Sequence, residues 1–237
     1  MSTNWEFIQS ATSKTQHGWS LTLNPTQPTS FATFQSETGQ WRAVAIQPVS
    51  QHALQPEEVY VRDRDLIVRF AQTPDDEFSF ALNWRTLPTT GNLECGVELW
   101  ASIQTQRLDT SPELELRSDG GNGNWSILKH CELTESSDGS SPEVAAPAAA
   151  WVLEHQDNLG RPCTGIWLIE PTDQRHAHPL SRQDERLQRV RLFDHFMEKG
   201  VIRRARMQFW TAACKLSRDE IRAAYQAFAN RPLPLTA

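Results

Sequence analysis

Residues 189–212 read RVRLFDHFMEKGVIRRARMQFWTA, and apolar and polar side chains alternate along both halves of this stretch. Because successive side chains of a β-strand point to opposite faces, the alternation predicts two strands. Glycine adopts a left-handed backbone at little steric cost, so Glu198-Lys199-Gly200 would join the strands as a hairpin turn. The stretch therefore indicates an antiparallel β-protein.

The two faces of this predicted hairpin differ sharply in character. The apolar face carries Val190, Leu192, Phe196, Val201, Ala205, Met207 and Phe209, and alternation adds Arg203 there in a structural role. The opposite face carries Arg189, Arg191, His195, Arg204, Arg206, Gln208 and Trp210. Planar guanidinium groups suit carboxylate, sulfate or phosphate, so we expect this basic face to bind a ligand. The plainer interpretation is a solvent-facing edge hairpin that charge protects from edge pairing.

The same alternation recurs along most of the chain. Glu58–Phe70 reads as a hairpin around Asp63-Arg64-Asp65, and Val97–Thr105 reads as a half-buried strand. Ser217 and Glu220 fit a capping box that opens an amphipathic helix over 216–230. We therefore predict an all-β fold, a large two-layer antiparallel β-sandwich with a C-terminal α-helix.

We expect one domain over residues 1–237. Residues 134–149 are rich in Ser, Pro and Ala and predict a mobile loop. Strands of the same character resume at Ala150–His155, so an insertion is favoured over a domain boundary.

Charge and composition narrow the partners. The chain has a net charge of -6, whereas residues 186–206 hold seven basic and two acidic residues. This polarity favours a local anion site over a nucleic-acid interface. No signal peptide and no stretch long enough for a membrane helix is recognisable, so we expect a soluble cytoplasmic protein that binds neither nucleic acid nor membrane. The four cysteines show no paired spacing and predict buried free thiols.

Candidate catalytic residues come from the strands. His195 lies among cations that favour its neutral form, which could act as a base, although an ordinary surface histidine is the plainer interpretation. Its carboxylate partner would be a strand residue: Glu98 is our candidate, with Glu115, Glu154 and Glu170 as alternatives. Neither GxSxG nor HExxH occurs, so the hydrolase classes with those signatures lose support.

Two further motifs are interpreted plainly. His176-Ala-His178 has metal-ligand spacing but needs a distant third ligand, such as His155, Glu154 or Glu170. We read it as a solvated loop and expect no metal and no cofactor. The run Ser118–Asn124 lacks the GxxxxGK[ST] pattern of a phosphate-binding loop and reads as a tight turn.

The run FMEKGVIRRAR at 196–206, near the end of a Trp-rich chain, resembles the closing strands of galactose-mutarotase-like supersandwich proteins. That superfamily includes aldose epimerases and the β domains of polysaccharide lyases and glycoside hydrolases. The resemblance covers about a tenth of the chain and implies a sugar-binding sandwich. The epimerases use a His and a Glu, but no motif in this sequence assigns those roles to a definite pair of residues.

The leading functional hypothesis is binding or processing of a carbohydrate, in the manner of an epimerase, lyase or hydrolase. The expected partner is an acidic or phosphorylated sugar, bound by the four arginines of the basic face with Trp100 and Trp210 as stacking surfaces. The alternative is a non-enzymatic interaction or scaffold domain whose basic strand docks an acidic partner. The sequence does not determine the oligomeric state.

Overall fold

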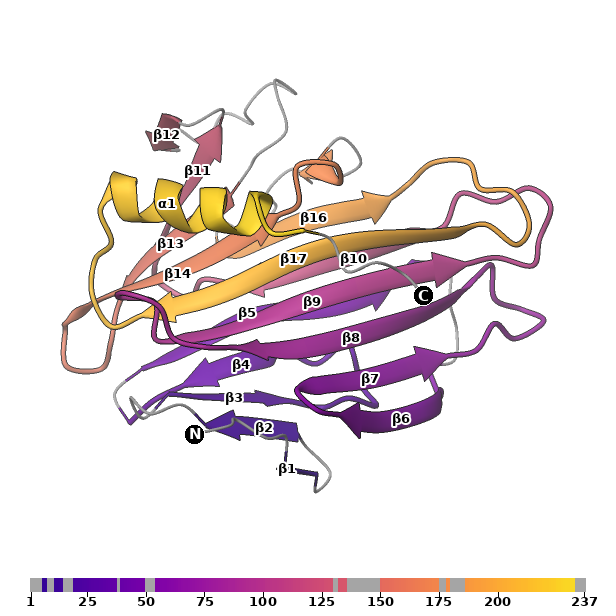
Figure 1. The fold of residues 1–237 in the computed structure, drawn as a ribbon, viewed down its shortest axis with the longest axis horizontal. Helices are drawn as coiled ribbons and strands as arrows, with labels where there is room; N and C mark the ends of the chain where they lie inside the picture. Colours follow the sequence, from indigo (N-terminus) through magenta and orange to yellow (C-terminus); the bar gives the residue numbers. More distant parts are fainter. Residues whose placement is uncertain are drawn as a thin grey trace.

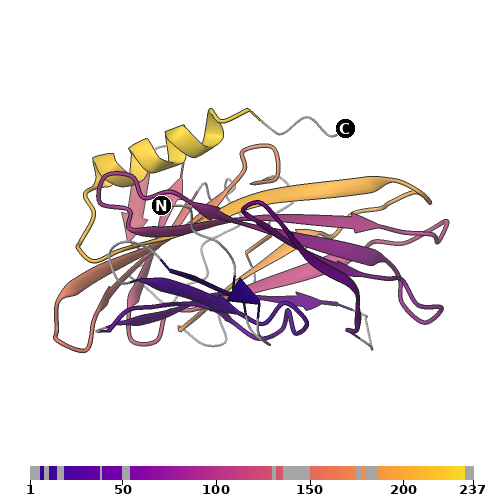
Figure 2. The same ribbon diagram turned by 60° about the horizontal axis from the view of Figure 1, so that its bottom comes forward.

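The computed structural model describes residues 6–7, 11–14, 19–37, 39–49, 54–129, 132–135, 150–174, 178–179 and 186–232, and its strands form two antiparallel sheets. The eight-stranded sheet contains, in spatial order, β1 (Glu6–Phe7), β2 (Ala11–Lys14), β3 (Ser20–Leu23), β4 (Ala32–Gln35), β5 (Gln40–Pro48), β10 (Glu113–Asp119), β16 (Leu187–Phe193) and β15 (His178–Pro179). The nine-stranded sheet contains β12 (Glu132–Glu135), β11 (Asn124–Lys129), β13 (Ala150–Gln156), β14 (Pro162–Ile169), β17 (Ile202–Ala212), β9 (Cys95–Gln104), β8 (Ser79–Leu87), β7 (Asp65–Phe70) and β6 (Pro56–Arg62). The two sheets are layers of a sandwich (Figure 1, Figure 2), so the predicted all-β fold is confirmed.

The sandwich core forms because alternate residues of both sheets are apolar. Trp151, Trp167 and Phe209 lie opposite one another on three neighbouring strands, with ring centroids 5.1 and 5.5 Å apart. All three side chains are fully buried. Burying a side chain of this size contributes roughly 1.5–3 kcal/mol, so this aromatic row anchors the nine-stranded sheet to the core.

The predicted hairpin within residues 189–212 is wrong. β16 pairs with β10 and β15 in one sheet, and β17 pairs with β9 and β14 in the other. The connection between them crosses from one layer to the other, with Gly200 at the predicted left-handed turn position (φ +83°). Val190 and Met207 both enter the same core cluster, from opposite layers. Two apolar strand faces can meet across a core as readily as lie side by side, and alternation does not tell these cases apart.

By contrast, the predicted hairpin at Glu58–Phe70 is confirmed. β6 pairs with β7 from Pro56 to Arg62, and Asp63 takes a positive φ of 54° in the turn.

Helix α1 (Arg218–Ala229) lies on the outer face of the nine-stranded sheet, where Figures 1 and 2 show it over β13, β14 and β17. The predicted capping box is confirmed, since Ser217 Oγ accepts from the Glu220 N–H while Glu220 Oε2 accepts from the Ser217 N–H at 2.8 Å. A second apolar cluster fills the space below the helix: Leu87, Leu93, Leu128, Ala150, Val152, Ile166, Leu168, Trp210, Ala212, Leu216, Ile221 and Phe228. The middle strands of this sheet are consequently buried on both faces.

Two expectations about chain organisation lie largely outside the described residues. Of the predicted loop at 134–149 the structure describes only 134–135, which end β12. The single domain over 1–237 stays a prediction. Within the described ranges, no helix combines the length and the apolar character needed to cross a membrane.

Candidate functional site

The four arginines of the predicted basic face do not share a face. Arg189 and Arg191 lie on the outer side of the eight-stranded sheet, while Arg204 and Arg206 lie on the outer side of the nine-stranded sheet. Arg189 pairs with Glu115 (Nε–Oε1 4.0 Å), and Arg191 with Glu113 (Nε–Oε2 3.2 Å). The prediction fails because β16 and β17 belong to opposite layers, so their polar sides point away from each other.

Arg206 is a buried structural residue instead of a ligand-binding one. Its side chain is 1% exposed, forms an ion pair with Glu170 and donates from Nη2 to the Phe228 carbonyl oxygen at 2.8 Å. Its guanidinium also lies 4.5 Å from the ring centroid of Phe228 and 5.5 Å from that of Trp100. These contacts fix α1 to the sheet.

Glu98, the predicted catalytic carboxylate, belongs to the same buried arrangement. Its oxygens accept from Trp100 Nε1 (3.0 Å), Gln208 Nε2 (2.7 Å) and Arg231 Nη1 (3.3 Å), and Glu98 is 1% exposed. Trp210 in turn donates to Gln208 Oε1 at 2.9 Å. Trp100 and Trp210 therefore belong to a hydrogen-bonded network with Glu98 and Gln208. The Trp210 ring is buried, and the Trp100 ring is partly buried with the Arg206 guanidinium over it, which does not favour the predicted stacking role.

The predicted pair of Glu98 and His195 is not formed. His195 lies in the connection between β16 and β17, where Nδ1 contacts the Phe193 carbonyl oxygen, and it lines a small cavity to which Glu98 does not contribute. The predicted site residues thus divide among an outer sheet face, a buried network and a small cavity.

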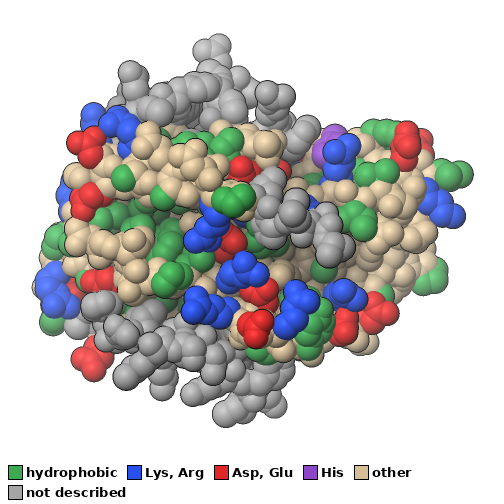
Figure 3. Space-filling model, in the orientation of Figure 1, with side chains coloured by type: hydrophobic (Ala, Val, Ile, Leu, Met, Phe, Trp, Pro, Cys, Tyr) green, Lys and Arg blue, Asp and Glu red, His purple; other side chains and the backbone are tan. Residues whose placement is uncertain are grey.

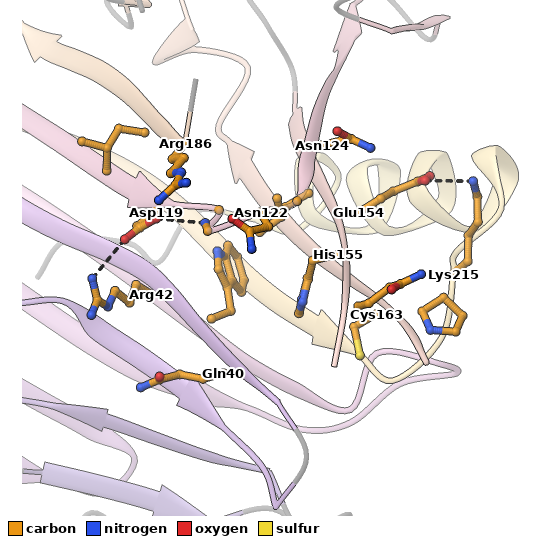
Figure 4. Close-up of a pocket in the computed structure, with 18 residues that line it drawn as sticks. Gln40, Arg42, Asp119, Asn122, Asn124, Glu154, His155, Cys163, Arg186 and Lys215 are labelled. Atoms are coloured by element: carbon orange, nitrogen blue, oxygen red, sulfur yellow. Dashed lines mark hydrogen bonds and ion pairs between the residues drawn. The ribbon is translucent and has the colours of Figure 1, made fainter. Parts of the chain in front are cut away.

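A larger cavity of about 850 Å³ opens at one end of the sandwich, between the two sheets. Its walls come from the start of β5, the turn between β10 and β11, the end of β13, the start of β14 and the start of β16 (Figure 4). We call it the large cavity; its polar side chains are Gln40, Arg42, Asp119, Asn122, Asn124, Glu154, His155, Gln156, Arg186 and Lys215.

The glycine-rich turn at 120–123 shapes one wall. Gly121 takes a left-handed backbone (φ +57°), and its N–H donates to Asp119 Oδ1 at 2.9 Å. A Cβ atom on Gly123 would lie 2.8 Å from the Glu154 carbonyl oxygen and 2.9 Å from His155 Cβ. The absence of a side chain at Gly123 lets the turn pack directly on the strand that carries His155.

His155 is the most unusual side chain of the large cavity. Its Nε2 atom is buried and has no hydrogen-bond partner among the described residues, and neither has Nε1 of Trp41 in the same wall. Burial is the main cause of a lowered pKa for His155, so its neutral form prevails near pH 7. A neutral imidazole can accept or donate one hydrogen bond at this atom.

Two cation–carboxylate pairs lie among the residues that line the large cavity. Arg42 Nη1 lies 3.1 Å from Asp119 Oδ2, and Lys215 Nζ lies 2.8 Å from Glu154 Oε2. Figure 4 shows Glu154 pointing toward Lys215 and away from His155, as expected for adjacent residues of a strand. Arg186 adds a third cation, and the lining residues therefore carry a small positive excess.

The cavity offers little for covalent chemistry. Burial raises the pKa of the Cys163 thiol, which keeps it protonated and a poor nucleophile. Within the described parts of the chain, no group of three His, Cys, Asp or Glu side chains could hold a metal ion. Residues 176 and 177 of the His176-Ala-His178 motif lie outside those parts.

Sequence reasoning missed most of this site. Asp119 and Arg42 meet because β10 pairs with β5, a contact between residues far apart in the chain that no local pattern signals. His155 entered the sequence analysis only as a distant metal ligand. The glycine-rich run was the one local signal, and its interpretation as a turn is correct.

Comparisons with known proteins identify no family. No protein-family model matches the chain, and no curated protein matches it. Among solved structures, the Slr1438 protein from Synechocystis sp. PCC 6803 matches with a TM-score of 0.54 and 10% identity over 90% of this chain and 99% of its own. A protein of Escherichia coli K12 provisionally named aldose 1-epimerase matches with a TM-score of 0.43 and 8% identity over 83% of this chain and 96% of its own. The first likeness is one of fold, and nothing about the chemistry of this chain follows from the name of the second.

Proposed function

We propose that the chain binds a small carbohydrate with an anionic substituent in the large cavity. The observation that carries this proposal is the buried, unpartnered Nε2 atom of His155 in the cavity wall. Buried polar atoms in folded proteins nearly always have a partner, and one without a partner in the wall beside a cavity indicates where an entering ligand could donate or accept.

The size and lining of the cavity support this ligand class. Its volume of about 850 Å³ falls within the range typical of small-molecule sites. The amides of Gln40, Asn122 and Asn124 can each donate and accept, which suits a ring of hydroxyl groups. Arg42 and Arg186 favour a carboxylate or phosphate on that ring.

The proposal assigns distinct roles to these residues. His155, neutral near pH 7, would accept a hydrogen bond from a sugar hydroxyl. Arg42, which is more than half exposed at the rim, would exchange part of its contact with Asp119 for the ligand's anionic group. The geometry supports binding and does not define a reaction, since the carboxylates of the lining, Asp119 and Glu154, pair with Arg42 and Lys215.

The rival hypothesis of a protein-docking basic surface has less support. It requires one continuous basic face, whereas Arg189 and Arg204 lie on opposite outer sides of the sandwich. On the face seen in Figure 3, basic and acidic side chains are interspersed.

Calorimetric titration with a panel of sugars tests the proposal. We expect glucuronate, galacturonate or a hexose phosphate to bind, and the matching neutral hexose to bind at least tenfold more weakly. His155→Ala and Arg42→Gln should each lower the affinity about tenfold, equivalent to about 1.4 kcal/mol. Arg62→Gln, a change at an exposed arginine at the end of β6, is the control and should bind normally. Failure of every sugar acid and sugar phosphate to bind would overturn the proposal.

A further inference from the structure

A second cavity, of about 200 Å³, lies at the other end of the same strands. β14 and β16 begin at the large cavity and end at this one, whereas β17 runs in the opposite direction. The eight residues of β14 span roughly 25 Å, which separates the two cavities. We call it the small cavity; it is lined by Thr172, Asp173, Leu192, Phe193, His195, Arg203, Arg204 and Ala205.

The backbone beside the small cavity is strained. Phe193 and Asp194 are consecutive non-glycine residues with positive φ, +75° and +25°. Phe193 is 4% exposed, and the Asp194 carboxylate lies 3.6 Å from Arg191 Nη1, so packing and charge hold both residues in place. Such conformations are costly, persist only where the surroundings impose them, and concentrate at functional sites. His195 directly follows these two residues and lines the small cavity.

Two cations of the small cavity form no ion pair with a described residue. Arg203 and Arg204 are exposed, and neither forms a hydrogen bond or ion pair with a described residue. Arg206 on the same strand and Arg191 on β16 behave differently, since both pair with carboxylates. The expectation that Arg203 is buried in a structural role is wrong, because this end of β17 extends beyond the apolar core and residues 202–204 are exposed.

Asp173 also lines the small cavity, where its carboxyl group opposes an anion when ionised and tolerates one when protonated. Asp173 Oδ2 accepts the N–H of Arg206 at 2.8 Å, so this oxygen is engaged away from the arginine side chains of the cavity. Burial is the main reason that the pKa of Asp173 rises to about 6, and its protonated form can donate a hydrogen bond.

We propose that the small cavity is a second ligand site, which binds a single oxyanion group between Arg203 and His195. Arg204 is the next residue of β17, so its side chain points to the outer side of the sheet. Guanidinium groups bind tetrahedral and planar oxyanions with paired hydrogen bonds. The exposed hydroxyl-bearing residue Thr172 lies at the same opening. The volume is below that of a typical drug-sized site and fits one phosphate or sulfate group better than a sugar ring. The ligand is thus a free oxyanion or the phosphoryl group of a metabolite.

Titration followed by amide chemical shifts tests the site, with sodium sulfate at about pH 7.5 and constant ionic strength. Sulfate keeps its charge across the pH range in which Asp173 titrates. We expect saturable shifts confined to residues 172–173, 193–195 and 203–205. Arg203→Gln should lose at least tenfold in affinity, whereas Arg204→Gln, on the opposite face of the same strand, and Arg62→Gln should lose little. Asp173→Asn, which removes a negative charge at this pH, should bind sulfate more tightly.

Two further measurements identify the source of the anion and distinguish this site from the large cavity. Glycerol phosphate that binds at least tenfold more tightly than inorganic phosphate would assign the site to a metabolite's phosphoryl group, and equal affinities would assign it to the free anion. His155→Ala should leave sulfate binding unchanged. Linear shifts without saturation, an equal loss in Arg62→Gln, or full binding by Arg203→Gln would each overturn the proposal.

Discussion

The guanidinium of Arg206 forms an ion pair with the carboxylate of Glu170 beneath α1, and these residues are 1% and 6% exposed. Arg206 also donates to the Phe228 carbonyl oxygen in the last turn of the helix. One side chain therefore joins β17, the segment after β14 and the C-terminal helix. The helix is part of the folded core and not an appendage to it.

Replacing Arg206 by Met should destabilise the protein strongly. The change leaves the Glu170 carboxylate buried without its partner, and breaking a buried pair in this way costs about 3–5 kcal/mol. Urea unfolding followed by tryptophan fluorescence measures the loss. Arg204→Met, two residues earlier on the same strand and exposed, is the matched control and should change the free energy of unfolding by less than about 0.5 kcal/mol.

A double change separates the charge from the packing. Arg206→Met with Glu170→Gln removes both charges and should recover part of the stability that Arg206→Met loses. A single variant as stable as the wild type would contradict the structural role of Arg206.

Asp173 should make the protein less stable as the pH rises from acid to neutral. Burial raises the pKa of this carboxyl from 3.8 to about 6, so the folded state binds its proton more tightly than the unfolded state. The stability contributed by the proton is complete below the unfolded pKa and is lost as the pH rises through about 6. Burial also raises the pKa of Glu170, which acts in the same direction.

Asp173→Asn keeps the acceptor for the Arg206 N–H and removes the titration. Between about pH 5 and about pH 7.5, the wild type should lose about 1 kcal/mol more of its unfolding free energy than the variant. Denaturant unfolding of both proteins at the two pH values measures this difference. Identical pH dependence would show that Asp173 titrates normally.

Local patterns in the sequence predicted the elements of the fold well. Val97–Thr105 was expected as a strand and is β9 (Cys95–Gln104), and the helix expected over 216–230 spans Arg218–Ala229. Alternation and capping act over a few residues, so a single sequence contains them. The pairing of the strands is a long-range property. The Glu198-Lys199-Gly200 turn is compatible with a hairpin, and only the strand pairing shows that the connection crosses between layers.

The candidate site was predicted less well, for a related reason. Arg204 and Arg206 have the same alternation, yet one is exposed and the other buried. The difference arises because α1 covers only part of the outer face of the sheet, and no pattern within β17 reveals where the helix will lie. Likewise, His155 becomes notable only when the turn at 120–123 packs on its strand.

The cysteines should differ widely in reactivity. Burial raises the pKa of Cys95 to about 12, whereas Cys214 is only partly buried and its pKa is raised from the usual value mainly by desolvation. Only the thiolate reacts with iodoacetamide, so access and ionisation both protect Cys95. Peptide mapping by mass spectrometry near pH 8 should find Cys214 alkylated well before Cys95. Denatured protein should lose this order, and equal rates in the native protein would contradict the buried position of Cys95.

Two glycines of the turn at the large cavity should respond differently to replacement by alanine. At Gly121 an added Cβ atom meets nothing within 4 Å. Gly121→Ala should therefore lower the free energy of unfolding only through the strain of a left-handed backbone, by on the order of 1 kcal/mol. At Gly123 the added atom would lie 2.8 Å from the Glu154 carbonyl oxygen, a backbone atom that cannot turn aside. Gly123→Ala must therefore displace the turn from β13 and move the wall that faces His155.

We expect Gly123→Ala to destabilise the protein by about 1–3 kcal/mol and to weaken sugar-acid binding at least tenfold, while Gly121→Ala binds nearly as the wild type does. Urea unfolding and calorimetry on both variants provide the comparison. If Gly123→Ala binds normally although its stability falls, the turn supports the fold alone and does not position the ligand.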